Sequence, residues 1–125
     1  MKKILMVLAF VLLLTAAASE DLFAQQINLG TFPVGSWLDT NYNAVWEFSS
    51  NNIVIKVNGA VVFDFSKNTI QNFNVGMVGT NPSITFSCPQ AGRTYRFTTR
   101  LPGSGLTMTI DRPDEAQYVV NMDKQ

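Results

Sequence analysis

Apolar and polar residues alternate along the chain beyond residue 33, and turn-rich breaks interrupt the alternation about every 8–12 residues. A period of two places successive side chains on opposite faces of a strand, and no segment of helical length repeats its apolar residues every 3.6 positions. The pattern predicts nine strands, over residues 34–39, 43–49, 52–57, 60–66, 71–77, 83–88, 94–100, 105–111 and 117–122. We therefore expect an all-β protein.

The register of the first hairpins follows from their turns. A tight turn over Ser49–Asn52 keeps the apolar faces of its two strands together and brings Glu47 close to Lys56 on the other face. Its predicted pairs are Phe48 with Ile53, Trp46 with Ile55 and Ala44 with Val57.

The break at Asn58-Gly59 allows two kinds of loop. A two-residue type I′ loop suits this dipeptide but divides the apolar residues between the two faces. A three-residue loop over Val57–Gly59, with Gly59 left-handed in a bulge, keeps one apolar face, and this is the loop we expect. Its predicted pairs are Ile55 with Val61 and Ile53 with Phe63.

Two later turns predict the rest of the register. A turn over Pro89–Gly92 pairs Phe86 with Tyr95 and Ile84 with Phe97, and a turn over Pro102–Gly105 pairs Leu101 with Leu106, Thr99 with Met108 and Phe97 with Ile110. Short loops and one apolar face predict an up-and-down antiparallel meander of eight or nine short strands that closes into a small barrel without exposed edges. A two-sheet β-sandwich is the alternative.

The first residues have the composition of an export signal. Met1–Lys3 is positively charged, Ile4–Leu14 is almost wholly apolar, and small residues follow at Thr15–Ser19. We expect residues 1–24 to be a secretory signal peptide cleaved after Ala18 or Ala24, and residues 25–125 to form a single domain. The apolar run is too short to span a membrane, which takes about 20 residues. No cysteine lies near the cleavage site, so we expect a periplasmic or extracellular protein that is not a lipoprotein and has no transmembrane segment after cleavage.

Composition excludes several functions. The chain has no histidine, which excludes Ser-His-Asp catalysis and imidazole zinc sites, and its one cysteine cannot form an internal disulfide. Nine basic residues balance nine acidic ones, which argues against binding to nucleic acid. The arginines at 93, 96 and 100 do not keep one strand face, and the acidic cluster at 111–115 is interrupted by arginine and proline. We therefore expect no catalytic residue, no metal site and no cofactor.

One segment carries a family resemblance. Gly35-Ser36-Trp37 opens the first predicted strand, and Trp46-Glu47-Phe48 lies on the second. This resembles the G-x-W start of lipocalins and related calycin barrels, with bacterial lipocalin-like domains as the nearest comparison. The resemblance implies that Gly35 and Trp37 close one end of the barrel and that a late arginine, Arg112 in preference to Arg100, packs over the indole ring.

The predicted interior decides between two functions. Side chains expected to face inward are Trp37, Trp46, Phe48, Ile53, Ile55, Val61, Phe63, Phe65, Phe73, Val75, Ile84, Phe86, Tyr95, Phe97, Met108 and Ile110. The candidates for contact with a ligand are Trp37, Trp46, Phe48, Phe63, Phe86, Tyr95 and Phe97.

With an open interior, we expect a non-enzymatic exported barrel that binds a small apolar molecule. With a filled interior, the barrel acts through its surface, as an inhibitor, an adhesin or a partner of an envelope protein. The segment 25–33 then either offers an apolar patch to that partner or packs across the open barrel end.

Overall fold

The computed structural model describes residues 26–100 and 103–125. The expected signal peptide, Leu101 and Pro102 lie outside this part of the chain. The strands are β1 (Gly35–Asp39), β2 (Ala44–Ser49), β3 (Asn52–Val57), β4 (Ala60–Asp64), β5 (Gln71–Val78), β6 (Asn81–Cys88), β7 (Arg93–Arg100), β8 (Gly105–Asp111) and β9 (Tyr118–Lys124). A short 3₁₀ helix, η1 (Phe65–Lys67), replaces the end of the predicted strand 60–66. Within the described residues, no helix is long and apolar enough to cross a membrane.

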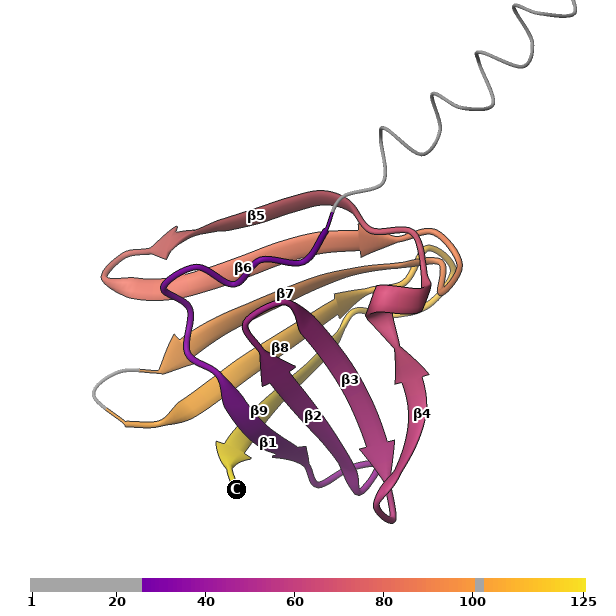
Figure 1. Cartoon of the computed structure of the whole chain (residues 1–125), viewed down its shortest axis with the longest axis horizontal. Helices are drawn as coiled ribbons and strands as arrows, with labels where there is room; N and C mark the ends of the chain where they lie inside the picture. The colour runs from indigo at the N-terminus through magenta and orange to yellow at the C-terminus, as the bar shows by residue number, and fades with distance from the viewer. Residues whose placement is uncertain (1–25, 101–102) are drawn as a thin grey trace, which may run out of the picture.

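The strands form one antiparallel sheet in the order β4-β3-β2-β1-β9-β8-β7-β6-β5. Strands that follow one another in the sequence pair with each other, except β4 and β5. The two ends of the series are joined because β1 pairs with β9 as well as with β2. The sheet curls through 224° into a half-barrel (Figure 1). The all-β meander is therefore confirmed, as one curved sheet instead of the two sheets of a sandwich. Its two edges, among the described strands, are β4 and β5.

The predicted β2–β3 hairpin is confirmed. Phe48 lies opposite Ile53, Trp46 opposite Ile55 and Ala44 opposite Val57. On the other face Lys56 Nζ lies 3.0 Å from Glu47 Oε2, the expected ion pair. The turn at Ser49–Asn52 therefore suffices to set this register.

The predicted three-residue loop between β3 and β4 is wrong. Val57 pairs directly with Ala60, and the positive φ of Asn58 (53°) and Gly59 (80°) fits a two-residue type I′ loop. The bulge lies within β4, at Val62, and it returns Phe63 to a position opposite Ile55. Val61 was expected in the interior but is 53% exposed, because it precedes the bulge.

In the β6–β7 hairpin Phe86 lies opposite Tyr95 and Ile84 opposite Phe97, as predicted. The β7–β8 register is shifted by two residues from the prediction. Thr99 lies opposite Leu106, Phe97 opposite Met108 and Tyr95 opposite Ile110. A shift of two preserves the face of every side chain, so the inward residues remain inward although their predicted partners are wrong.

The open side of the half-barrel is filled by residues outside the strands. Ile27, Leu29 and Phe32 of the N-terminal segment are buried, and Phe32 stacks on Phe48 with ring centroids 5.9 Å apart. Phe65 of η1 is fully buried as well. The segment 26–33 thus packs into the core, and the alternative of an exposed apolar patch there is wrong.

Candidate functional site

The seven predicted ligand contacts form one aromatic cluster with Phe65. Phe97 lies 5.4 Å from Trp46 and 5.0 Å from Phe48, measured between ring centroids. Phe65 lies 5.2 Å from Tyr95 and 4.7 Å from Phe63. Contacts of this kind fix the rings against one another and exclude a ligand from between them. Phe48, Phe63, Phe86 and Phe97 therefore serve as core, and the structure brings only Trp46 of the seven to a pocket wall.

That pocket, which we call the mouth pocket, opens where the turn between β1 and β2 faces the loop between β8 and β9. Its volume is about 240 Å³. Apolar side chains form its floor. Four of the polar residues on its rim, Asp39, Tyr42, Arg112 and Tyr118, come from the two connecting segments or the ends of their strands. The lining residues are Asp39, Tyr42, Ala44, Trp46, Ile55, Arg93, Met108, Ile110, Arg112 and Tyr118.

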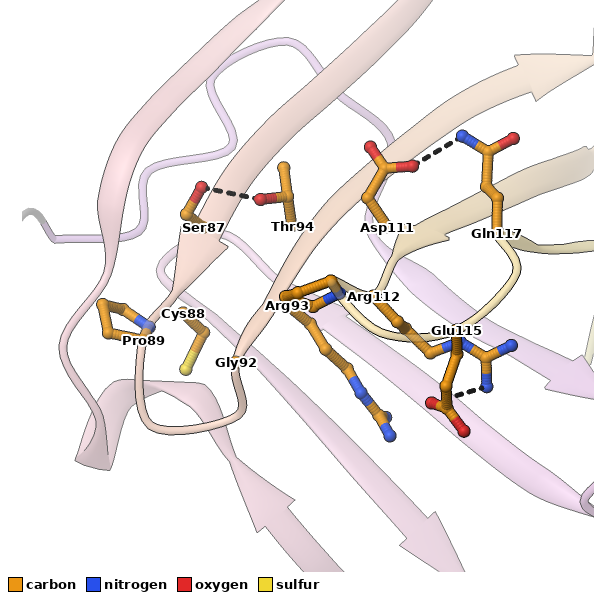
Figure 2. Close-up of a pocket in the computed structure, with 11 residues that line it drawn as sticks. Ser87, Cys88, Pro89, Gly92, Arg93, Thr94, Asp111, Arg112, Glu115 and Gln117 are labelled. Carbon is orange, nitrogen blue, oxygen red and sulfur yellow. Dashed lines mark hydrogen bonds and ion pairs between the residues drawn. The ribbon is translucent and has the colours of Figure 1, made fainter.

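A second depression, the outer groove, shares Arg93 and Arg112 with the mouth pocket. It lies between the β6–β7 turn and the β8–β9 loop (Figure 2), and its volume is about 440 Å³. Its polar pairs are internal to the protein: Ser87 with Thr94, and Gln117 Nε2 donating to Asp111 Oδ1. Arg93 and Arg112 line both cavities and separate them.

Arg112 is held in place by its own loop. Its Nε and Nη2 donate to the Ala116 carbonyl, at 3.1 and 2.6 Å, and its Nη1 lies 3.5 Å from Glu115 Oε2. The guanidinium also lies over the Tyr118 ring, 5.8 Å from the centroid. Arg112 therefore shapes the rim, with its charge already balanced by Glu115.

Asp39 is buried and also has its partners within the protein. The Tyr118 hydroxyl donates to it, at 2.8 Å from Oδ2, and the Asn41 backbone N–H donates to Oδ1 at 2.9 Å. Burial raises the pKa of Tyr118, and the bond to Asp39 adds to this, because both disfavour the phenolate. The phenol thus stays protonated at neutral pH and covers the carboxylate.

Arg93 differs from these two residues. It begins β7 on the same strand face as Tyr95 and Phe97, so it projects over the mouth pocket from the inward side. It is exposed, and none of the ion pairs between described residues includes it. Burial raises the pKa of the neighbouring Tyr95 phenol, while the Arg93 charge acts in the opposite direction. Arg93 therefore brings an unneutralised positive charge to the rim.

Trp37 lies away from this site. Its indole N–H donates to the Ser104 carbonyl at 2.9 Å, and its ring packs edge-on against Phe48. The cation over the ring is Lys124 Nζ, 5.7 Å from the centroid, and not Arg112. The expected pairing of Arg112 with Trp37 is wrong because these residues lie near opposite ends of β9.

Gly35 has a steric role beside Trp37. A Cβ atom at this position would lie 2.8 Å from Lys124 Cε, and the φ of 144° disfavours other residues. The contact is with the flexible end of the Lys124 side chain, so the backbone conformation is the stronger reason for glycine at this position of the G-x-W triplet.

Sequence reasoning missed four rim residues, Asp39, Tyr42, Arg93 and Tyr118. One usable signal existed for Arg93, since the predicted pairing of Phe86 with Tyr95 already places residue 93 on the inward face. The spacing of Arg93 to Arg96 and Arg100 conceals this signal, because the three arginines do not keep one face. A single inward-facing arginine can line the rim of a barrel without other arginines on the same strand face.

Comparison with protein-family models, with curated proteins and with solved structures found no match. Among the side chains of residues 26–100 and 103–125, no group of three or more His, Cys, Asp or Glu is arranged to hold a metal ion.

Proposed function

We propose that this chain is an exported, non-enzymatic, lipocalin-like protein that binds a small, mostly apolar molecule in the mouth pocket. The observation that supports this most is the division of the pocket into an apolar floor and a polar rim. Trp46 of β2 and Met108 and Ile110 of β8 are buried side chains that line the floor. Ligand sites commonly combine such a floor with a few polar groups that orient the bound molecule.

The size of the pocket limits the ligand. At about 240 Å³ it lies below the range of about 300–1,000 Å³ that is usual for drug-sized molecules. It suits one aromatic ring with a short side chain. Arg112 is paired with Glu115, and Asp39 accepts hydrogen bonds from the Tyr118 hydroxyl and the Asn41 backbone N–H. Arg93 has no ion-pair partner among the described residues, so it is the rim cation available to an anionic group on the ligand. We therefore infer an aromatic or short aliphatic molecule with one anionic end.

Tryptophan fluorescence tests this function, because Trp46 lines the pocket. In a Trp37→Phe variant the remaining emission comes from Trp46 alone, and we expect saturable quenching by phenylacetate. Ala44→Phe places a ring in the pocket and should abolish the response. Val62→Phe, at an exposed position on β4, is the matched control and should leave it unchanged. If phenylacetate, its amide and its alcohol analogue all fail to change the emission of the folded protein, the proposal is wrong.

A second candidate function is favoured by the packed aromatic cluster. A barrel filled by its own side chains can act through its surface, as an inhibitor, an adhesin or a partner of an envelope protein. The segment 26–33 cannot supply that surface, because its apolar side chains Ile27, Leu29 and Phe32 are buried. The contact area would have to include exposed apolar side chains elsewhere, such as Tyr42 and Val119.

A further inference from the structure

The strand at one edge of the sheet carries no charge. β5 contains no Asp, Glu, Lys or Arg, and neither does β6, to which it is joined. The uncharged stretch runs from Asn68 to Gly92, and the nearest charges on the same half of the sheet belong to β7, two strands from the edge. The exposed large apolar side chains of β5 are Met77 and Val78, at 61% and 51%.

An uncharged edge strand is unusual, because the outward backbone groups of an edge strand can pair with another strand. Proteins ordinarily protect such edges with charged residues, prolines, bulges or short length. β5 has eight residues and no proline, and its irregularity is confined to Gln71–Asn74. From Asn74 to Val78 it pairs with β6 without interruption, which leaves a regular edge on its other side.

The opposite edge of the same sheet is protected. β4 has five residues, a bulge at Val62 and an acidic end at Asp64. Lys56 of β3 pairs with its second residue, Val61, and Lys67 follows it in η1. The fold thus protects one edge against pairing and leaves the other open to it.

We propose that the segment Asn74–Val78 of β5 pairs antiparallel with the same segment of a second copy of the chain, which extends the sheet across a two-fold axis. The charge pattern selects this partner. A charged strand would lose hydration at this edge without gaining a countercharge, whereas a second β5 meets it with no like-charge repulsion. Antiparallel pairing of identical strands is self-complementary, so it closes as a dimer. β5 contributes nothing to the mouth pocket, so this inference is independent of the proposed function.

Sedimentation velocity at micromolar to millimolar concentration tests the dimer. We expect the wild-type protein to sediment as a dimer at the upper end of this range. Met77→Lys and Val78→Lys each add a charge to the edge and should shift the protein to a monomer, as read by sedimentation, while its far-ultraviolet dichroism stays unchanged. Val62→Lys adds the same charge at a 58%-exposed position on β4 and should leave the dimer intact.

Disulfide cross-linking supplies a second measurement that does not depend on weakening the edge. A Cβ at Gly76 meets only the Asn74 side chain, at 3.5 Å, so Gly76→Cys fits the fold. Under mild oxidation this variant should form a covalent dimer, whereas the wild-type protein should not, because Cys88 is fully buried. A wild-type protein that stays monomeric throughout, a dimer lost in Val62→Lys but kept in both β5 variants, or an edge that takes up only an unrelated extended peptide would each overturn the proposal.

Discussion

Arg93 places a positive charge, without an ion-pair partner in the described part of the chain, at the rim of the mouth pocket. It lies on the inward face of β7 beside buried Tyr95, and the ion pairs of the described residues do not include it. Arg112 stands at the same rim but has Glu115 and the Ala116 carbonyl as partners. The two arginines at this rim therefore differ in their partners, and under the proposed function Arg93 is the one available to a ligand.

Replacing Arg93 should change the selectivity of the pocket. Hydrogen bonds to charged groups contribute about 1.5–3 kcal/mol, and the exposure of Arg93 places its effect near the lower limit. We expect Arg93→Gln to weaken phenylacetate binding roughly tenfold and to leave binding of phenylacetamide unchanged, as read by Trp46 quenching. Arg96→Gln, one residue beyond Tyr95 on the outward face, serves as the control. Equal losses for both compounds would mean that Arg93 acts on the fold and not on the anion.

Gly35 makes a second residue-scale prediction. A Cβ at position 35 would lie 2.8 Å from Lys124 Cε, and the new residue would have to adopt the φ of 144° that Gly35 has. We expect Gly35→Ala to lower the free energy of unfolding by about 1–3 kcal/mol, because strained backbone conformations carry costs of that order. Gly76→Ala, whose Cβ has room and ordinary φ, should change it much less. Urea unfolding followed by tryptophan emission measures both variants.

At the scale of elements, η1 depends on its capping residue. Asp64 Oδ1 accepts hydrogen bonds from the backbone N–H and hydroxyl of Ser66 and from the side-chain amide of Asn52. These bonds, that from the Ser66 side chain first, lower the pKa of Asp64 below its usual 3.8. The cap holds η1 at the end of β4, where Phe65 enters the aromatic cluster.

This pKa shift predicts a pH dependence. A carboxyl whose pKa is lower in the folded state stabilises the fold above its unfolded pKa, and that stabilisation is lost as the pH falls through the folded pKa. Below about pH 4 the wild-type protein should therefore lose stability that an Asp64→Asn variant does not lose. Urea unfolding at neutral and at acid pH compares the two, and because Asp64 is largely solvated the difference should be small. Parallel loss in both proteins would show that other carboxylates account for it.

The sequence predicts the strands well and two of their registers poorly, for a physical reason in each case. Alternation sets which side chains face inward, so all nine strands and the interior set apart from Val61 are found from residue patterns. A bulge costs one residue and can occur in the loop or in the strand, which is why the β3–β4 prediction failed. A shift of two residues, as in β7–β8, leaves the apolar faces unchanged and is invisible to pattern alone.

The site was harder to predict than the fold. Asp39, Tyr42 and Tyr118 come together only because β9 lies beside β1, and Tyr118 stands 79 positions after Asp39. No local pattern connects residues that far apart in the sequence. The aromatic residues were found because they form the core, yet for the same reason most of them are unavailable to a ligand.

At the scale of the whole molecule, the two halves of the sheet meet at a narrow junction. β1 and β9 share two residue pairs, Trp37 with Lys124 and Leu38 with Asp123, and Gln125 N–H donates to the Ser36 carbonyl at 2.8 Å. Every other neighbouring pair of strands in the sheet shares at least four. The joint therefore depends on a few contacts between residues 36–38 and 123–125. The hairpins of each half connect residues that are close in the sequence, whereas this joint connects Trp37 with Lys124, so each half can form its own hairpins before the sheet becomes continuous.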